Sequence, residues 1–194
     1  MGLIAVRRGD VAAVVTSLEM TRRPSARPLP ASPLMLRRWT HPAPDKYRAL
    51  YRRVGQPWLW FSRLVMDDAT LLAAIHDDAV EVYAVVDRQG IEIGLLELDF
   101  RSGETCRIVF LGLVPELTGR GHGKWLMAQA MSLCWRRGIG RVRVNTCTLD
   151  HPSALGYYMK SGFSPYDRMV ETFRDPRLEG IYPRDVAPQI PLLD

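Results

Sequence analysis

One stretch of the sequence, between positions 108 and 137, combines an apolar run, closely spaced glycines and basic side chains. The run stops at Pro115, and apolar residues recur with helical spacing from Leu126 onward, which predicts a strand, a loop and a helix in this order. The loop contains Gly119, Gly121 and Gly123. The first N–H groups of a helix lack internal partners and carry partial positive charge, and glycine lets the main chain approach a ligand closely. The stretch therefore predicts a binding site for a phosphate group.

Three kinds of phosphate-binding loop can be compared with this stretch. A Walker-type loop needs glycine where the chain has Thr118, and serine or threonine where it has Trp125. A dinucleotide fingerprint needs glycine in place of Lys124 and an acidic residue about 20 positions later, where the region around Arg141 and Arg143 is basic. Both patterns fail, which leaves a third kind of loop, or a glycine-rich turn without a ligand.

The third kind is the pyrophosphate loop of the GNAT acetyltransferases, which this stretch resembles. Its signature is Arg/Gln-x-x-Gly-x-Gly/Ala between a sheet strand and a long helix, and Gly121 and Gly123 match it. Thr118 stands where a long polar side chain is usual in the family. The resemblance therefore implies one side-chain contact fewer to the cofactor, while the backbone cradle is unaffected.

A second block, residues 148–163, resembles the other GNAT signature, in which Asn-x-x-Ala leads a helix that ends in Tyr-x-Lys-x-Gly-Phe. His151 stands where asparagine is commoner. The residues that match are Ala154, Tyr158, Lys160, Gly162 and Phe163. The two blocks occur in the family's order, and the resemblance covers roughly residues 80–173 well and the N-terminal part loosely.

The expected secondary structure also follows the order of the GNAT fold. The class that this implies is α/β, with a mixed, mostly antiparallel sheet that is splayed at its centre and has helices on both faces. Strands are expected at 11–20, 34–39, 81–86, 91–100, 105–114, 142–148 and 166–173. Helices are expected at 45–54, at 69–76, after the glycine loop as far as Gly138, and at 152–160. Segment 22–44 is rich in proline, which favours either a crossing ordered by packing or a flexible linker.

We expect a single acetyltransferase-like domain over residues 1–194. Its acceptor-side part is 11–80, its cofactor-binding part is 81–173, and 174–194 form an extended C-terminal tail. The aromatic residues Trp58, Trp60 and Phe61 are candidates for a wall of the acceptor pocket or for the core beneath the sheet.

Composition narrows the function classes. The chain has 194 residues and a formal net charge of +5, and its arginines are scattered, which argues against nucleic-acid binding. No apolar run approaches the roughly 18 residues of a membrane span. Three widely spaced cysteines indicate neither a zinc site nor a disulfide framework. We therefore expect a cytoplasmic protein with reduced thiols and without a metal.

The resemblance implies acetyl-CoA as co-substrate. The pantetheine arm is expected to enter the splayed sheet and to pair with backbone at Leu113 and Val114, and the pyrophosphate to lie on the loop from Leu117 to Lys124. The expected contact residues are Leu113, Val114, Leu117, Thr118, Gly119, Arg120, Gly121, His122, Gly123, Lys124, His151, Ala154, Tyr158 and Lys160. Arg120 and Lys124 either pair with cofactor phosphates or remain solvated charges.

Two residues are the candidates for proton transfer. Tyr158 occupies the family position for protonating the leaving thiolate, and a phenol with a pKa of about 10 is protonated at neutral pH; a packing role against the cofactor is the alternative. Glu97 is the first candidate for the general base that an amine needs. Asp99, Glu104 and Glu116 are weaker candidates for this base, as is His151, which either caps a helix or contacts the pantetheine arm. A backbone N–H near Val114 is the expected donor to the oxyanion.

The function implied is direct transfer of an acetyl group to an amine of a small molecule or of a protein. The alternative is a GNAT-fold module that binds CoA or acyl-CoA without turnover. The acyl donor, the acceptor and a possible homodimer stay open, because the first two helices set acceptor specificity in such folds and resemble the family least.

Overall fold

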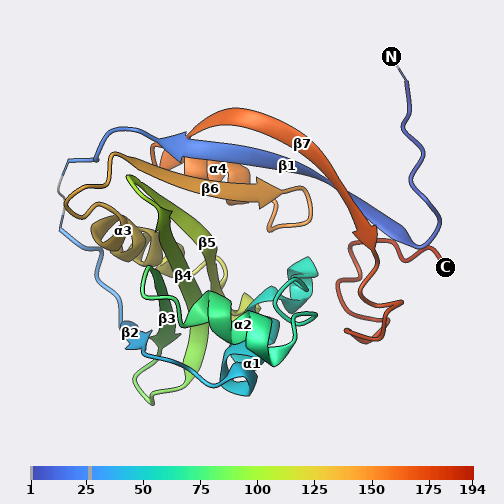
Figure 1. Cartoon of the computed structure of the whole chain (residues 1–194), viewed down its shortest axis with the longest axis horizontal. Helices are drawn as coiled ribbons and strands as arrows, with labels where there is room; N and C mark the ends of the chain where they lie inside the picture. The colour runs from blue at the N-terminus through green and yellow to red at the C-terminus, as the bar shows by residue number, and fades with distance from the viewer. Residues whose placement is uncertain (1, 26–27) are drawn as a thin grey trace.

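The computed structural model of the chain describes residues 2–25 and 28–194. Seven strands form one sheet, and four α-helices pack on it (Figure 1). The strands are β1 (Asp10–Met20), β2 (Met35–Trp39), β3 (Val80–Val86), β4 (Glu92–Ser102), β5 (Thr105–Leu113), β6 (Arg141–Cys147) and β7 (Ser164–Arg174). The helices are α1 (Pro44–Gly55), α2 (Asp68–Ile75), α3 (His122–Cys134) and α4 (Ala154–Lys160), with short 3-10 turns η1 (Gln56–Trp58) and η2 (Pro115–Leu117).

The strands lie in the order β2-β3-β4-β5-β6-β1-β7, and only the β5–β6 pair is parallel. The first strand of the chain thus lies between two of the last ones. Val15 in β1 is opposite Cys147 in β6 on one side and Met169 in β7 on the other. β1 therefore joins β7 to β6, and β6 connects both strands to the rest of the sheet through β5.

The sheet is splayed at its centre, as expected. The parallel pairing of β5 with β6 covers only Thr105 to Ile108, and β5 then continues to Leu113 paired with β4 alone. The register of β4 and β5 shifts after Glu97, so that Val109 is an extra residue in β5. Such a bulge bends a strand and increases its twist, and here it lies where β5 and β6 separate.

The helices flank this gap. In Figure 1, α1 and α2 lie in front of β3–β5, α3 lies behind them, and α4 lies beside β6. α1 buries Tyr47, Leu50, Tyr51 and Val54 on one face, at the helical spacing seen in the sequence. α2 begins at the expected cap, because Asp67 accepts a hydrogen bond from the Thr70 N–H at 2.7 Å.

α3 is shorter than its periodicity suggested. It ends at Cys134, and Trp135 leaves the helical region with φ −87° and ψ 65°. The Trp135 side chain is only 5% exposed and belongs to the main core. Packing of this ring therefore accompanies the end of the helix, and Gly138, which has a positive φ, lies in the following turn instead of next to the helix end.

The C-terminal segment does not lie extended. Residues 175–194 form successive turns that fold back on the α1–α2 connection, and Tyr182, Val186 and Ala187 make a small second core with Leu59. Arg177 is 4% exposed and holds these turns, because it pairs with Asp175 and donates to the backbone carbonyls of Val186, Ala187 and Ile190. A buried guanidinium needs several acceptors, and the turns supply them.

In the described part of the proline-rich segment, β2 lies before the start of α1 and pairs with β3 at the edge of the sheet. Leu34 and Trp39 are 7% exposed, so the segment is fixed to the main core near both ends of β2. Positions 26–27 lie outside the described residues.

Candidate active site

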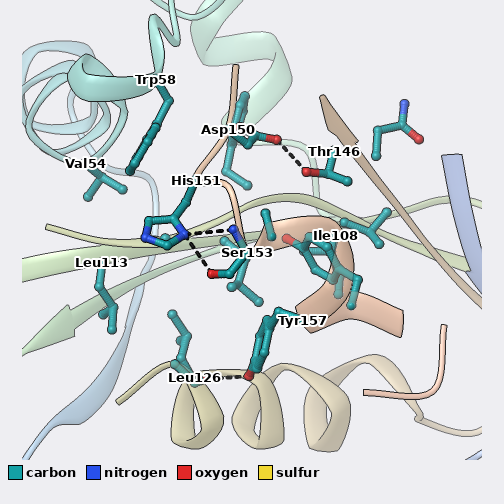
Figure 2. Close-up of a pocket in the computed structure, with 18 of the residues that line it drawn as sticks. Val54, Trp58, Ile108, Leu113, Leu126, Thr146, Asp150, His151, Ser153 and Tyr157 are labelled. Carbon is teal, nitrogen blue, oxygen red and sulfur yellow. Dashed lines mark hydrogen bonds between the residues drawn. The ribbon is translucent and has the colours of Figure 1, made fainter. Parts of the chain in front are cut away.

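A cavity of about 580 Å³ occupies the gap between the separated ends of β5 and β6 (Figure 2). Its walls come from three sources: the backbone and side chains of β5 beyond the bulge, the glycine loop with the start of α3, and the segment from Thr146 to Tyr158. Val54, Trp58 and Trp60 close it from the α1 side. The cavity therefore joins the two sequence blocks to the aromatic cluster that precedes α2.

The glycine loop lies at the mouth of this cavity. Gly119 and Gly121 have φ of 77° and 81°, a region in which side chains other than glycine are strained. Gly121 precedes the first residue of α3, and no side chain caps the helix there. A Cβ atom built at Gly119, Gly121 or Gly123 meets nothing within 4 Å. Uncapped N–H groups thus face open space, which fits the pyrophosphate of a CoA thioester.

Most of the expected cofactor contacts lie on the cavity wall: Leu113, Leu117, Thr118, Gly119, Gly121, Gly123, Lys124, His151, Ala154 and Tyr158. Four others do not belong to the wall that the described residues form: Val114, Arg120, His122 and Lys160. Val114 is 3% exposed, and its N–H donates to the Ile93 carbonyl at 2.9 Å. This N–H is therefore already used within the sheet, and the expected oxyanion donor at Val114 is not free.

Tyr158 lies in the wall of the cavity and is 8% exposed. Burial, and then the negative charge of Asp150, raise the pKa of its hydroxyl above the usual value. Within residues 2–25 and 28–194 this hydroxyl has no hydrogen-bond partner. Tyr158 is therefore a protonated phenol that is free to donate into the cavity.

The neighbouring Tyr157 has a different task. Its hydroxyl donates to the Gly123 carbonyl at 2.8 Å (Figure 2), which fastens α4 to the first turn of α3. Burial raises its pKa to about 12. Tyr157 therefore fixes the glycine loop, whereas Tyr158 lines the cavity with a hydroxyl that makes no hydrogen bond to the described residues.

Asp150 is a carboxylate on the same cavity wall as Tyr157 and Tyr158, and sequence analysis did not identify it as a site residue. One oxygen accepts hydrogen bonds from the Thr146 hydroxyl at 2.7 Å and the Cys147 N–H at 2.9 Å. The other accepts from the indole N–H of Trp60 at 3.3 Å. All three partners are neutral donors, and the carboxylate belongs to the cavity wall. Tyr158 lies on the wall of the same cavity, and the charge of Asp150 adds to the raised pKa of its hydroxyl.

His151 lies on the cavity wall, and one of its ring nitrogens is held by Ser153. Its Nδ1 atom accepts the Ser153 N–H at 3.2 Å and contacts the Ser153 hydroxyl at 2.7 Å (Figure 2). Because a backbone N–H can only donate, the neutral ring carries its proton on Nε2. The ring also packs edge-on against Trp58, with centroids 5.4 Å apart. This geometry disfavours His151 as a general base and makes it a support for the turn before α4.

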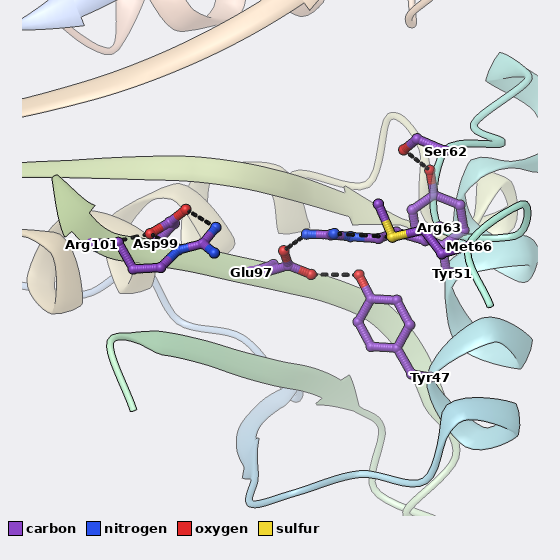
Figure 3. A network of polar contacts seen from close by, with 8 residues as sticks. All are labelled: Tyr47, Tyr51, Ser62, Arg63, Met66, Glu97, Asp99 and Arg101. Carbon is purple, nitrogen blue, oxygen red and sulfur yellow. Dashed lines mark hydrogen bonds and ion pairs between the residues drawn. The ribbon is translucent and has the colours of Figure 1, made fainter. Parts of the chain in front are cut away.

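Glu97, the expected base, lies elsewhere (Figure 3). It is 1% exposed, forms an ion pair with Arg63 and accepts a hydrogen bond from Tyr47. It is not part of the cavity wall formed by the described residues. The Arg63 guanidinium also lies 5.5 Å from the Phe110 ring centroid. This arrangement suits a structural carboxylate that fixes the α1–α2 connection to β4.

The sequence left open whether Trp58, Trp60 and Phe61 line a pocket or fill the core, and the structure shows both arrangements. Trp58 and Trp60 line the cavity, whereas Phe61 packs on Phe173 with ring centroids 4.7 Å apart. Trp60 is also in contact with Tyr51 and Phe110, at centroid distances of 5.7 and 5.1 Å. Trp60 therefore connects the cavity wall to the aromatic packing of the core.

Two negative findings apply to the described part of the chain. No group of three or more His, Cys, Asp or Glu side chains there is placed to hold a metal ion. None of its helices combines the length and the apolar character needed to cross a bilayer.

Comparison with protein families decides the classification. The model of the Acetyltransferase (GNAT) family matches residues 35–163. The chain belongs to the GNAT acetyltransferase family. Its GNAT region extends from β2 to the end of α4 and so contains the whole cavity except the contributions of β1 and β7. Membership makes acyl transfer the general activity of the fold. A search of curated protein sequences gives no significant match.

Solved GNAT structures show the same fold at low identity. A GCN5-related N-acetyltransferase from Sphaerobacter thermophilus is 16% identical with a TM-score of 0.61, over 86% of this chain and 52% of its own. An aminoglycoside acetyltransferase from an uncultured soil metagenomic sample, in complex with sisomicin, is 16% identical with a TM-score of 0.51, over 66% and 87%. The PaiA N-acetyltransferase from Thermoplasma acidophilum, in complex with coenzyme A, is 16% identical with a TM-score of 0.50, over 72% and 99%. The chain thus spans about half the length of the Sphaerobacter protein.

The GNAT pattern of the sequence contains one signal that points to Asp150. The residue stands directly before the position where the family has asparagine, in the turn that follows the end of β6. A carboxylate in this turn, next to the family's tyrosine helix, was as good a candidate as one within β4.

Proposed function

We propose that this protein transfers an acetyl group from acetyl-CoA to the amine of an acceptor. The observation that carries the proposal is the continuity of the cavity. It runs from a glycine loop with uncapped helix N–H groups, along unpaired β5 backbone, to a protonated phenol and a carboxylate at Tyr158 and Asp150.

The chain offers a separate surface for each part of acetyl-CoA. The first turn of α3 and the loop from Leu117 to Lys124 would hold the pyrophosphate. The side of β5 that faces the gap, from Val109 to Leu113, has no strand partner and would pair with the pantetheine amides. When bound, acetyl-CoA supplies an acetyl thioester at the inner end of the cavity.

The remaining residues act on protons and on orientation. Tyr158 keeps its proton at neutral pH and would donate it to the sulfur as the C–S bond breaks. Only a neutral amine can attack, so the ammonium form would first release one proton to solvent. Once the C–N bond has formed, the nitrogen would return a second proton to the Tyr158 oxygen, directly or through water. Tyr157 holds the loop and α4 together through the Gly123 carbonyl. Trp58, Trp60 and Val54 exclude water from the side on which an acceptor would enter.

The names of two structural neighbours agree with this proposal. The Thermoplasma protein was solved with coenzyme A, and the soil-metagenome protein is an aminoglycoside acetyltransferase. Both likenesses are below 20% identity, so the proposal depends on the cavity of this chain and on its family.

The test is calorimetric titration of acetyl-CoA into the wild type and into Gly123→Asp. Gly123 is helical and has no neighbour within 4 Å of a Cβ atom, and an acidic side chain in the first turn stabilises a free helix N-terminus. The variant should therefore fold well and lose binding by charge repulsion with the pyrophosphate. Gly123→Asn is the matched control for bulk.

We expect micromolar binding by the wild type, a smaller loss in Gly123→Asn and loss by at least about tenfold more in Gly123→Asp. Release of CoA on addition of an amine then separates an enzyme from a module that binds CoA without turnover. A wild type that does not bind acetyl-CoA would overturn the proposal.

A further inference from the structure

We propose that Asp150 binds the amino group of the acceptor, and that the acceptors are cationic amines without a carboxylate beside the amino group. This inference rests on the proposed function. It adds to it the group that recognises the amine and the chemical class of the substrate.

The first argument is the hydrogen-bonding capacity of the carboxylate. An ionised carboxylate has about four acceptor sites. Thr146, the Cys147 N–H and Trp60 occupy three of them at Asp150. None of these donors carries a charge, so the negative charge of Asp150 is held in place without an ion pair. A partly buried carboxylate on a cavity wall in this state attracts a cation.

The second argument is the place of Asp150 beside the reacting groups. Asp150 and Tyr158 line the same cavity, and the turn that follows Asp150 leads directly into α4, the helix that carries Tyr158. The hydroxyl proposed to protonate the leaving sulfur therefore shares this cavity with the carboxylate. An amino group that donates to Asp150 is therefore held close to the thioester position. Fixing a nucleophile near its target is a large contribution to catalysis in general.

The third argument is the way Trp60 is fixed. Its ring packs between Tyr51 and Phe110. Its backbone is held on both sides, because its N–H donates to the Gly55 carbonyl at 3.1 Å and its carbonyl accepts from the Tyr182 hydroxyl. The indole N–H that reaches Asp150 is thus set by α1, β5 and the C-terminal turns together. Trp60 is a positioning residue for Asp150.

The other charged groups of the cavity define which amines fit. Lys124 lies at the glycine loop, where the phosphates are expected, and Glu171 adds a second negative charge from β7. Arg107 is a cation on the part of the cavity wall that β5 forms, two residues before the bulge at Val109. A carboxylate next to the reacting amine would be brought against Asp150, and like charges in close contact are strongly disfavoured. Amine cations carried on an apolar or sugar body, or on a lysine side chain, avoid this clash.

The experiment compares phenethylamine with phenylalanine, which differ by one carboxylate. Steady-state CoA release and calorimetric binding of each compound, in the presence of CoA, are measured for the wild type, Asp150→Asn and Glu179→Gln. Glu179 is exposed on the C-terminal turns and serves as the control for loss of one negative charge.

The wild type should bind phenethylamine at least about tenfold more tightly than phenylalanine. Asp150→Asn should weaken phenethylamine binding about 10- to 100-fold, as expected for a hydrogen bond to a charged group, and should leave acetyl-CoA affinity unchanged. Glu179→Gln should behave as the wild type.

A double-mutant cycle tests the positioning role. Trp60→Phe keeps an aromatic ring and removes the N–H, so it should raise the KM for phenethylamine several-fold with little change in kcat. In the Asp150→Ala background the same change should have almost no effect on KM. Equal effects in the two backgrounds would show that Trp60 acts only as a wall.

The outcomes separate this inference from the proposed function. Retained acetyl-CoA binding with equal amine affinity in the wild type and Asp150→Asn overturns the role of Asp150 alone. Tighter binding of phenylalanine than of phenethylamine overturns the substrate class. Loss of acetyl-CoA binding by the wild type instead removes the proposed function, and the calorimetric amine titrations still decide whether Asp150 binds a cation.

Discussion

Two carboxylates, Glu97 and Asp150, each lie beside a tyrosine whose pKa is raised first by burial and then by the carboxylate charge. The charge of Glu97 is paired, because Tyr47 donates a hydrogen bond to this carboxylate and Arg63 forms an ion pair with it. The charge of Asp150 has no ion-pair partner among the described residues, since its donors are neutral, and the Tyr158 hydroxyl has no hydrogen-bond partner among them either. The comparison teaches that the partners of a carboxylate, more than its burial, decide whether it stabilises the fold or faces a substrate.

The two regions are joined by one short connection. Arg63 and Trp60 stand three positions apart between α1 and α2, and the first reaches Glu97 while the second reaches Asp150. Glu97 therefore fixes the segment that carries the positioning residue of the site. We expect the two carboxylates to separate cleanly into effects on stability and effects on function.

The largest expected effect is on folding. Glu97→Gln leaves the buried Arg63 charge without its partner, and loss of one member of a buried ion pair costs about 3–5 kcal/mol. Urea unfolding should show this loss. Asp150→Asn should cost less, about 1–3 kcal/mol, because the amide oxygen can still accept from Thr146 and Cys147 and only the Trp60 N–H loses its acceptor. Adding Arg63→Met to Glu97→Gln should recover most of the stability; if it does not, the ion pair is not the main contribution of Glu97.

The second effect distinguishes the two tyrosines. Tyr158→Phe removes the proposed proton donor and should lower kcat about 100-fold or more, with the protein as stable as the wild type. Tyr47→Phe removes one hydrogen bond to a buried carboxylate and should cost about 1–3 kcal/mol of stability, with kcat nearly unchanged. Steady-state kinetics and urea titration of both variants check this reciprocity, which would fail if the two effects came together in one variant.

The smallest effect is a shift along the pH axis. The charge of Asp150 contributes to the raised pKa of Tyr158, so the phenol stays protonated, and kcat stays high, above the pH at which a free tyrosine ionises. Asp150→Asn removes that charge and should lower the pKa of Tyr158. The alkaline fall in residual kcat should then begin at lower pH than in the wild type, while Glu179→Gln, which removes a distant exposed charge, should leave it in place. An unmoved alkaline limb in Asp150→Asn would place the two groups too far apart to interact.

Local patterns were sufficient for most of the fold. The sequence predicts strands on both sides of residues 87–90, and the structure has β3 and β4 there, with a turn between them in which the N–H of Gly90 donates to the Asp87 carbonyl. The end of α3 was missed, because helical periodicity continues past Cys134 and only tertiary packing draws Trp135 into the core. The C-terminal turns were missed for a similar reason, since prolines predict irregular backbone but not its burial by Arg177 and Leu59.

The sequence predicted those parts of the candidate site whose geometry depends on the local backbone. It did not predict the parts that depend on contacts between side chains far apart in the chain. The glycine loop and Tyr158 follow from spacing within one segment each. Strand alternation indicates that Glu97 and Asp99 share a face, but nothing in β4 itself shows that Arg63 covers one of them. The partnership of Asp150 with Trp60 likewise joins residues 90 positions apart, and this kind of contact has no local signature.

The place of β1 has a consequence for the order in which the molecule assembles. β1 is made early, but both of its sheet neighbours, β6 and β7, come from the last third of the chain. Contacts of such long sequence separation form slowly, because the intervening chain must first be brought together. The part of the cavity wall that Val15 and Glu171 form is therefore completed only after the glycine loop and its helix have been synthesised. During synthesis, the mouth of the cavity would form before this last part of its wall.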